Sequence, residues 1–183
     1  MKKTFTAAAL AASLALLSGC NSDADEPAEG ESEVGTETVA ALMEDADDLS
    51  VVSDILGNTG LQGVFDGNAP YTILAPTDSA FSALDIPLEG QEARAARVAI
   101  VREHIVPGFL SRADIEAAIG RSGGSVEMQT MGSNTLTFSS EGDNLLVTSS
   151  DGSEAMVAGD VISGANGSII PIDTVLKSMD ASQ

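Results

Sequence analysis

The sequence predicts an α+β domain, because helix signals cluster in its first part and strand signals in its second. Residues 39 to 119 carry N-cap residues followed by apolar residues at helical spacing. Beyond Gly123 the chain changes to short β-prone runs that Gly, Asn, Asp and Ser separate. Helices and strands that are segregated along a chain are typical of α+β folds, so we expect a single α+β domain.

Residues 1–19 have the pattern of a lipoprotein signal peptide. Two lysines precede an apolar run, Ala7 to Leu17, that is shorter than the roughly 20 residues a transmembrane helix needs. The run ends in Leu-Ser-Gly-Cys, which resembles the bacterial lipobox, so we expect cleavage between Gly19 and Cys20 and lipidation of the Cys20 thiol. The alternative is an ordinary cleavable signal followed by a chance cysteine.

Residues 20–38 are expected to form an acidic disordered tether that starts at the lipidated cysteine. Eleven acidic residues fall between Asp23 and Asp48, and almost nothing in the tether is apolar enough to bury. Because more than one acyl chain anchors a protein firmly, the tether would hold a domain at residues 39–180 clear of a lipid surface. In enteric bacteria an aspartate after the cysteine favours the inner membrane, so by analogy Asn21 favours the outer membrane where there is one.

The charge and the composition exclude several classes of partner. The chain carries 8 basic and 28 acidic residues, a formal net charge of −20, so nucleic acid and bare anionic lipid would repel it. Its only cysteine is Cys20, which leaves no internal disulfide. Five Phe, one Tyr and no Trp supply few stacking platforms for bases or sugars. The acidic tether is expected to serve solubility and extension, with weak association of cations left open.

The first helices are expected directly after the tether. The segment Val39 to Glu44 is the expected start of folded structure, and Ser50 is a suitable N-cap for a helix over Val51 to Leu56. Gly57 and Gly60 would end that helix, and a further short apolar piece follows.

The stretch Tyr71 to Leu84 should turn from a strand into a helix. Residues 71–75 are β-branched and apolar, as in a buried strand, and Pro76 removes a ladder donor. Thr77 is placed as an N-cap, and Phe81 begins the apolar side of a helix that should pack back onto the strand.

The remaining elements are expected in the order helix, helix, strands. A helix over Gln91 to Val106 would be closed by Pro107-Gly108. A capping box from Ser111 to Asp114 would open a helix that runs through Ile119 and stops at Gly120. The β-prone runs, which we expect to form small antiparallel strands, are Val126 to Gln129, Thr135 to Phe138, Leu145 to Thr148, Ala155 to Ala158 and Ile169 to Val175.

Three separated segments resemble the fasciclin domain family. Tyr71 to Leu84, YTILAPTDSAFSAL, resembles its first signature, and Arg102 to Gly108, REHIVPG, resembles its central Tyr-His and Val-Pro-Gly segment. Asn166 to Leu176, NGSIIPIDTVL, resembles its second signature. Their order and spacing agree with the family over roughly Leu49 to Met179. The resemblance implies a fasciclin-like wedge of small β-sheets flanked by several short helices, with no general cofactor or catalytic activity.

Two positions depart from the family pattern. The tyrosine that usually precedes the central histidine is Glu103, and the histidine of the second signature is Pro171 or its neighbour. In animal members the Tyr-His segment has been implicated in integrin binding, and Glu103 argues against that role here. A lone histidine in an apolar context is more often a hydrogen-bonded core residue than a ligand. The candidate interaction residues, for which an ordinary structural or solvated role is the alternative, are His104, Glu103, Asp78 and Arg112.

The sequence shows no catalytic or metal-binding constellation. Gly120 to Gly124 formally matches G-x-S-x-G, but the expected order of helix then strand, and a histidine that precedes the serine, contradict a nucleophile elbow. One histidine and an acylated cysteine leave no His-pair zinc site and no free thiol. We therefore expect no enzymatic activity, no metal and no cofactor.

These observations predict a lipid-anchored, extracytoplasmic binding or adhesion module of the bacterial cell envelope. Its partner would be a protein or a polysaccharide at the cell surface, and not nucleic acid. The alternative is a structural or assembly partner of another envelope protein without an adhesive role, for which an unpaired strand edge in the second half could support β-augmentation.

Overall fold

The computed structural model describes residues 35–65, 67, 69–84 and 93–176. All described residues belong to one compact unit, which lies within Ser32–Gln183. The predicted signal peptide, Cys20 and most of the predicted tether therefore lie outside the described residues. In the described part of the chain, no helix is long and apolar enough to cross a membrane.

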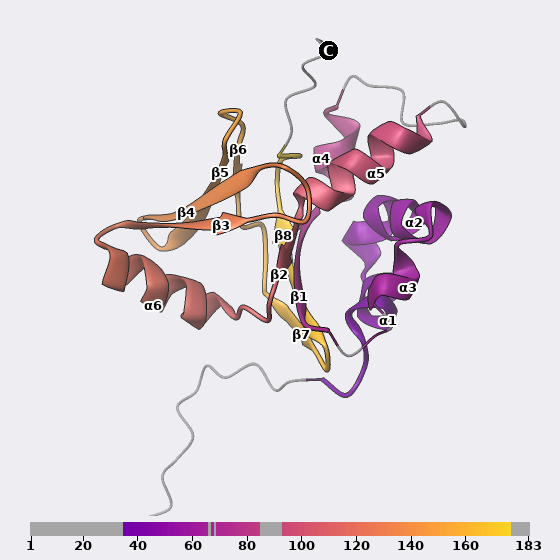
Figure 1. The fold of residues 1–183 in the computed structure, drawn as a ribbon, viewed down its shortest axis with the longest axis horizontal. Helices are drawn as coiled ribbons and strands as arrows, with labels where there is room; N and C mark the ends of the chain where they lie inside the picture. The colour runs from indigo at the N-terminus through magenta and orange to yellow at the C-terminus, as the bar shows by residue number, and fades with distance from the viewer. Residues whose placement is uncertain (1–34, 66, 68, 85–92, 177–183) are drawn as a thin grey trace, which may run out of the picture. The chain divides into compact units, whose positions relative to one another are not determined.

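The described residues form a run of helices followed by two small β-sheets, as Figure 1 shows, so the predicted α+β class is confirmed. The helices are α1 (Val39–Glu44), the 3-10 helix η1 (Asp47–Leu49), α2 (Ser50–Thr59), α3 (Gln62–Phe65), α4 (Asp78–Ser82), α5 (Arg94–Glu103) and α6 (Arg112–Ser122). The strands are β1 (Tyr71–Pro76), β2 (Ile105–Pro107), β3 (Ser125–Gln129), β4 (Thr135–Glu141), β5 (Asn144–Ser149), β6 (Glu154–Met156), β7 (Ile162–Gly164) and β8 (Gly167–Ile172).

The first sheet has the strand order β2-β1-β8-β7. β1 and β8 pair in parallel over their whole lengths, from Tyr71 opposite Gly167 to Pro76 opposite Ile172. The predicted antiparallel pairing is confirmed between β8 and β7 and is wrong between β8 and β1, because the last strand returns across the domain to lie beside the first. Every residue of β8 is buried, as in a central strand that is covered on both faces.

Pro171 occupies this central strand without interrupting its pairing with β1. The backbone N–H of Thr77 donates to the carbonyl of Ile172, and alternate residues of a parallel strand face the same neighbour, so the Pro171 nitrogen faces away from β1. On that side the pairing with β7 already ends at Ile169. There the carbonyl of Pro171 accepts from the backbone N–H of Ala158 at 2.8 Å, beside the antiparallel bridge between Val157 and Ile172. The missing N–H of Pro171 therefore removes no bond to β1 or β7, and only the return bond to Ala158 is lost.

The second sheet has the strand order β3-β4-β5-β6, and all its pairs are antiparallel, as predicted for this half. Helix α6 packs against β3 and β4. The buried side chains of β4 and β5 lie on the inward face and are apolar except for Ser149, and the alternating side chains of the other face are partly or fully exposed and polar except for Leu146. This alternation is typical of an antiparallel sheet with one solvated face.

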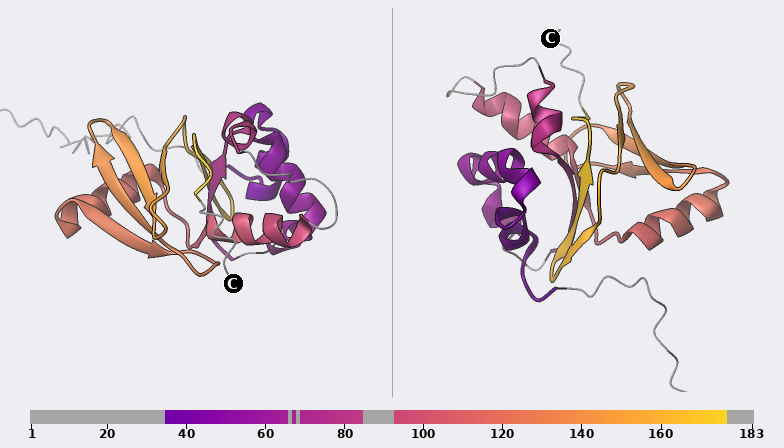
Figure 2. Two further views of the ribbon diagram at one scale, coloured as in Figure 1. Left: turned by 90° about the horizontal axis from the view of Figure 1, so that it is seen from above. Right: turned by 180° about the vertical axis from the view of Figure 1, so that it is seen from behind.

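The first sheet separates two hydrophobic cores, and Figures 1 and 2 show α1 to α5 on one of its sides and α6 with the second sheet on the other. Successive residues of β1 alternate between them: Ile73 packs with the helices and Leu74 with the second sheet. The same alternation occurs in β8, where Ile169 and Ile170 belong to different cores.

Some predicted helix ends are confirmed and others are wrong. Thr77 and Ser111 cap α4 and α6 through their side chains, and Ser111 and Asp114 form the predicted capping box. Ser50, however, is the first residue of α2 and not its N-cap, and Gly57 lies inside that helix. α2 ends only at Gly60, whose φ of 78° is the left-handed conformation that favours glycine.

Two further helix ends and one strand differ from the prediction. α5 stops at Glu103 and residues 105–107 become β2, because tertiary pairing with β1 outweighs the helical pattern of the isolated sequence. α6 continues beyond Gly120 to Ser122, and Gly123 with a φ of 84° ends it. The three-residue strand β7 was missed because it is too short to show an alternating pattern.

Candidate binding surface

The three segments that resemble the fasciclin family meet inside the domain. The Thr72 hydroxyl donates to the carbonyl of Gly108 at 2.8 Å and accepts from the backbone N–H of Leu110 at 3.0 Å. The Ser168 hydroxyl donates to the carbonyl of Leu110 at 2.7 Å. Both Thr72 and Ser168 are fully buried, so these hydroxyls hold the segments together and are not available to a ligand.

The Asn-Gly pair of the third segment also has a packing role. The side-chain oxygen of Asn166 accepts from the backbone N–H of Val39 at 2.9 Å, and its amide nitrogen donates to the carbonyl of Phe65, so it ties α1 and α3 to β8. A Cβ atom added at Gly167 would lie 2.0 Å from the carbonyl oxygen of Tyr71. The parallel pairing of β1 and β8 therefore requires glycine at this position.

His104 lies in the core directly after α5 and is only 1% exposed. Its Nε2 accepts from the backbone N–H of Leu176 at 2.9 Å, so Nδ1 carries the proton and donates to the carbonyl of Ile100 at 2.8 Å. This neutral imidazole joins α5 to the end of the third segment. The structure thus gives His104 the hydrogen-bonded core position expected of a lone histidine in an apolar context.

Glu103 is also buried, and its carboxylate is held by the loop between β3 and β4. One oxygen accepts from the backbone N–H and the hydroxyl of Ser133, at 3.0 and 3.2 Å. The other accepts from the Thr130 hydroxyl at 2.9 Å and from the backbone N–H of Asn134 at 3.0 Å. A Cβ added at Gly132 would lie within 2.3 Å of the carboxylate, so glycine leaves the space that Glu103 fills.

Two opposing effects act on the pKa of Glu103. Burial raises the pKa by disfavouring the charged form, and the hydrogen bonds from Ser133, Asn134 and Thr130 together lower it by a larger amount. The net result is a pKa below the ordinary value, so the carboxylate is charged at neutral pH. Glu103 is therefore an internal anion that fixes the β3–β4 loop to the end of α5.

Asp78 connects two helices. Its Oδ2 accepts from the Ser50 hydroxyl at 2.6 Å, and its Oδ1 accepts from the backbone N–H of Val51 at 2.9 Å. The residue before α2 is Leu49, which cannot cap the helix with its side chain. Asp78 therefore caps α2 from the first turn of α4.

Arg112 lies at the start of α6 and is partly exposed. Its Nε donates to Glu116 Oε1 at 2.8 Å, and its Nη2 donates to the carbonyl of Asp143 in the β4–β5 turn at 2.7 Å. The four candidate interaction residues thus lie in three different places. Only the neighbours Glu103 and His104 are brought together, and both are buried.

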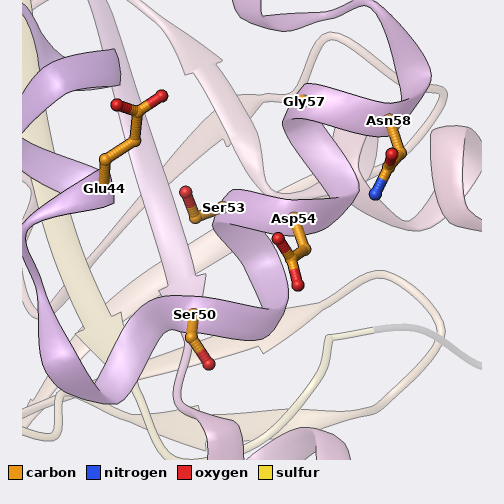
Figure 3. A pocket seen from close by; sticks show the side chains of 6 residues that line it. All are labelled: Glu44, Ser50, Ser53, Asp54, Gly57 and Asn58. Carbon is orange, nitrogen blue, oxygen red and sulfur yellow. The ribbon is translucent and has the colours of Figure 1, made fainter.

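A polar cleft of about 390 Å³ lies along the exposed face of α2. Figure 3 shows the side chains that line it, from the end of α1 and from successive turns of α2: Glu44, Ser50, Ser53, Asp54, Gly57 and Asn58. Asp78 adjoins this cleft through its hydrogen bond to Ser50. The lining presents carboxylate, hydroxyl and amide groups, which can bind hydroxyl or amine groups but contain no apolar platform.

Sequence reasoning missed this cleft for a physical reason. Its α2 residues recur at intervals of three and four, which is the pattern of the solvated face of any amphipathic helix. The hollow appears only where α1 packs beside that face. No signal in the sequence separates it from an ordinary solvated surface.

The glycine-rich segment Gly120 to Gly124, predicted to be a turn, is a turn only at Gly123 and Gly124, because α6 continues through Ser122. Ser122 is the last residue of α6, and Gly123 and Gly124, with φ of 84° and 128°, lead directly into β3. A nucleophile elbow has the opposite order, a strand followed by a helix. Among the described residues, no group of three or more His, Cys, Asp or Glu side chains is placed to hold a metal ion.

Comparison with known proteins agrees with this architecture. Residues 47–178 match the model of the fasciclin domain. A solved structure of a FAS1 domain pair, from the insect cell adhesion molecule fasciclin I, is similar to this chain with a TM-score of 0.57 and 20% sequence identity. The similarity covers 70% of this chain and 45% of that chain, so this chain spans less than half of the domain pair. A search of curated protein sequences found no match.

The chain belongs to the fasciclin domain family, since the family match covers most of its length. Domains of this family are typically extracellular or at the cell surface, and they generally act in adhesion and binding and not in catalysis. The segments that identify the family in this chain contribute the buried residues Thr72, His104 and Ser168 described above. Family membership therefore follows from the core, while a binding partner must be recognised by the exposed surface.

Proposed function

We propose that this protein is a lipid-anchored, extracytoplasmic binding or adhesion module of the bacterial cell envelope. The single observation that carries the proposal is the fasciclin match at residues 47–178, downstream of a basic and apolar leader that ends in Leu-Ser-Gly-Cys. The lipid on Cys20 would fix the chain, and the acidic tether would set its reach. The domain would present a polar surface to a protein or a polysaccharide.

We place the contact surface at the polar cleft on α2. Polar side chains line this hollow, and Asp78 caps α2, the helix along which it lies. Asp54 and Asn58 are both exposed there and can accept from the hydroxyls of a glycan or the amines of a protein. Glu103 and His104 would stabilise the fold through their buried hydrogen bonds and would not contact the partner.

The anchor is tested by the Cys20→Ser substitution in cells. The wild-type chain should sediment with membranes, leave them only in detergent, and carry a diacylglyceryl mass on its N-terminal peptide. The substituted chain should lose that mass and remain unprocessed by lipoprotein signal peptidase. An unmodified wild-type cysteine on a soluble mature chain would refute the anchor and favour an ordinary cleavable signal.

The binding role is tested with the full chain, Cys20→Ser, on a glycan array and on extract of the organism's own envelope at low and high salt. Saturable binding should fall at least several-fold in the double substitution Asp54→Ala with Asn58→Ala. Asp160→Ala, an exposed change in the turn before β7, is the matched control and should bind like the parent. Equal binding by all three chains would refute the cleft, and no saturable binding to either target would refute the adhesion role.

A further inference from the structure

The β3 strand leaves one edge of the second sheet open. It is the terminal strand in the order β3-β4-β5-β6, and Figure 1 shows it at the border of the sheet above α6. The side chains of Ser125, Glu127 and Gln129 lie on the solvated face of the sheet and are exposed. An open edge presents unpaired backbone groups to any extended chain that can reach them.

The hydrogen-bond pattern shows which backbone groups of β3 face that edge. The N–H of Thr130 donates to the carbonyl of Asn134, which marks this pair as a hydrogen-bonded pair of the antiparallel ladder. Because such pairs alternate, Met128 and Val126 are the next residues bonded to β4. The N–H and C=O groups of Ser125, Glu127 and Gln129 therefore point away from β4.

These outward groups have no hydrogen-bond partner among the described residues. The open stretch has a defined end, because the N–H of Met131 donates to the carbonyl of Ile105 at 2.7 Å. The free edge is thus the five-residue strand β3, with three of its residues ready to pair.

The side chains of β3 specify what kind of strand would fit. Val126 and Met128 point to the core side and are partly buried against α6 and the sheet, so they leave apolar surface at the edge. Glu127 lies between them on the solvated face, opposite Thr137 in β4. A strand that pairs with β3 would cover Val126 and Met128 with apolar side chains on the core face. On the solvated face, one of its side chains would lie directly opposite Glu127.

A second copy of this chain is a poor occupant of the edge. Antiparallel pairing of two β3 strands about their centres would place Glu127 directly opposite Glu127, and like charges in that position are destabilising. Charge at an edge strand is a known means of avoiding self-association. A partner strand with a basic residue opposite Glu127 would instead form a favourable charge pair.

We propose that β3 is a docking edge for an extended segment of another protein with the alternating pattern apolar, basic, apolar. The segment adds a fifth strand to the second sheet, its backbone bonds to Ser125, Glu127 and Gln129, and its basic side chain pairs with Glu127. This interaction is separate from the α2 cleft and needs neither the lipid anchor nor a glycan ligand.

The test uses the full chain, Cys20→Ser, and a synthetic peptide with the sequence Val-Thr-Val-Lys-Val-Thr-Val. A matched peptide carries glutamate in place of the lysine. The lysine peptide should bind the parent chain saturably and more tightly than the glutamate peptide. Glu127→Lys should reverse that preference. For each chain, the peptide with the like charge should bind about threefold to tenfold more weakly than the peptide with the opposite charge. Glu154→Lys, the same charge change on the opposite edge strand β6, should leave the preference unchanged.

Residue-resolved amide exchange by NMR gives a second readout. In the free chain the amides of Val126 and Met128 should exchange slowly and those of Ser125, Glu127 and Gln129 fast. The lysine peptide should slow the three fast amides and no amide of β6. No saturable binding, an unchanged preference in Glu127→Lys, or slow exchange of the three amides that depends on protein concentration without peptide would each overturn the proposal.

Discussion

Glu103 illustrates how a carboxylate can be charged in a site that excludes most water. Burial alone would favour the neutral acid, and four hydrogen bonds from the β3–β4 loop reverse that preference. Two of the donors are backbone N–H groups of Ser133 and Asn134, so the loop conformation and the charge depend on each other. In this chain the residue before the central histidine therefore fixes the end of α5 to the β3–β4 loop through a carboxylate.

Replacement of Glu103 by glutamine should lower the free energy of unfolding at pH 7 by about 1–3 kcal/mol. The amide of glutamine would turn a donor toward the donors of Ser133 or Asn134, which leaves buried groups unpaired. Urea unfolding followed by circular dichroism measures the difference. Glu141→Gln, an exposed change on the same sheet, is the control and should cost little.

The Glu103 contribution should depend on pH in one direction. Its folded pKa lies below the ordinary value of 4.5, so the folded state holds the proton less readily than the unfolded state. The stabilisation is therefore complete above that value and is lost as the pH falls through the folded pKa. The difference between the parent and Glu103→Gln should shrink below pH 4.5. A constant difference down to pH 3 would show that the charge does not matter.

His104→Ala should chiefly lower stability, by about 2–4 kcal/mol, because it leaves the carbonyl of Ile100 and the N–H of Leu176 without their buried partner and opens a cavity. The melting temperature measures this. Binding by the fraction that is still folded, measured well below the melting temperature, should equal that of the parent. Lost binding with unchanged melting would instead assign His104 to a binding site.

At the scale of elements, α2 and α4 depend on each other through one carboxylate. The first free amides of α2 have no local side-chain acceptor, and Asp78 of α4 supplies it across 27 residues of sequence. A cap from a distant element couples the position of α2, and so the shape of the cleft along it, to the strand–helix turn after β1. 

Asp78→Ala should lower the free energy of unfolding by about 1 kcal/mol, the typical value of a lost N-cap. Asp78→Asn should cost less, since its side-chain oxygen can still accept from Val51. Thermal unfolding compares the two, and amide exchange should show faster opening of the first turn of α2 in the alanine variant. Equal stability of the alanine variant and the parent would show that water replaces the carboxylate without loss.

At the scale of the whole molecule, the formal net charge of −20 sets a background of self-repulsion. Salt screens exposed charges, and the Debye length falls from about 30 Å at 0.01 M to about 8 Å at 0.15 M. We expect the melting temperature to rise by about 2–6 °C over this range. The rise should be alike in NaCl and KCl, and alike for CaCl₂ at equal ionic strength. A much larger effect of millimolar CaCl₂ would contradict simple screening and indicate a specific cation site.

The family signatures could be recognised from the sequence because helix capping and core packing restrict which residues can occupy their positions. Thr77 and Ser111 cap the helices that follow them, and a cap involves only neighbouring residues. The Asn166-Gly167 pair and Thr72 were recognisable because their packing contacts restrict the residues allowed there. These features predicted the α+β class, the fasciclin family and the core position of His104.

Tertiary structure alone determined the strand pairing of the first sheet, the polar cleft and the open sheet edge. Pairing with β1 turned residues 105–107 into a strand and made β8 parallel, and neither partner is near in sequence. Packing of α1 beside α2 created the polar cleft, and the end of the second sheet at β3 left an edge open. The physical reason is that capping and periodicity act over a few residues, whereas pairing partners, hollows and free edges depend on segments that meet only when the chain is folded.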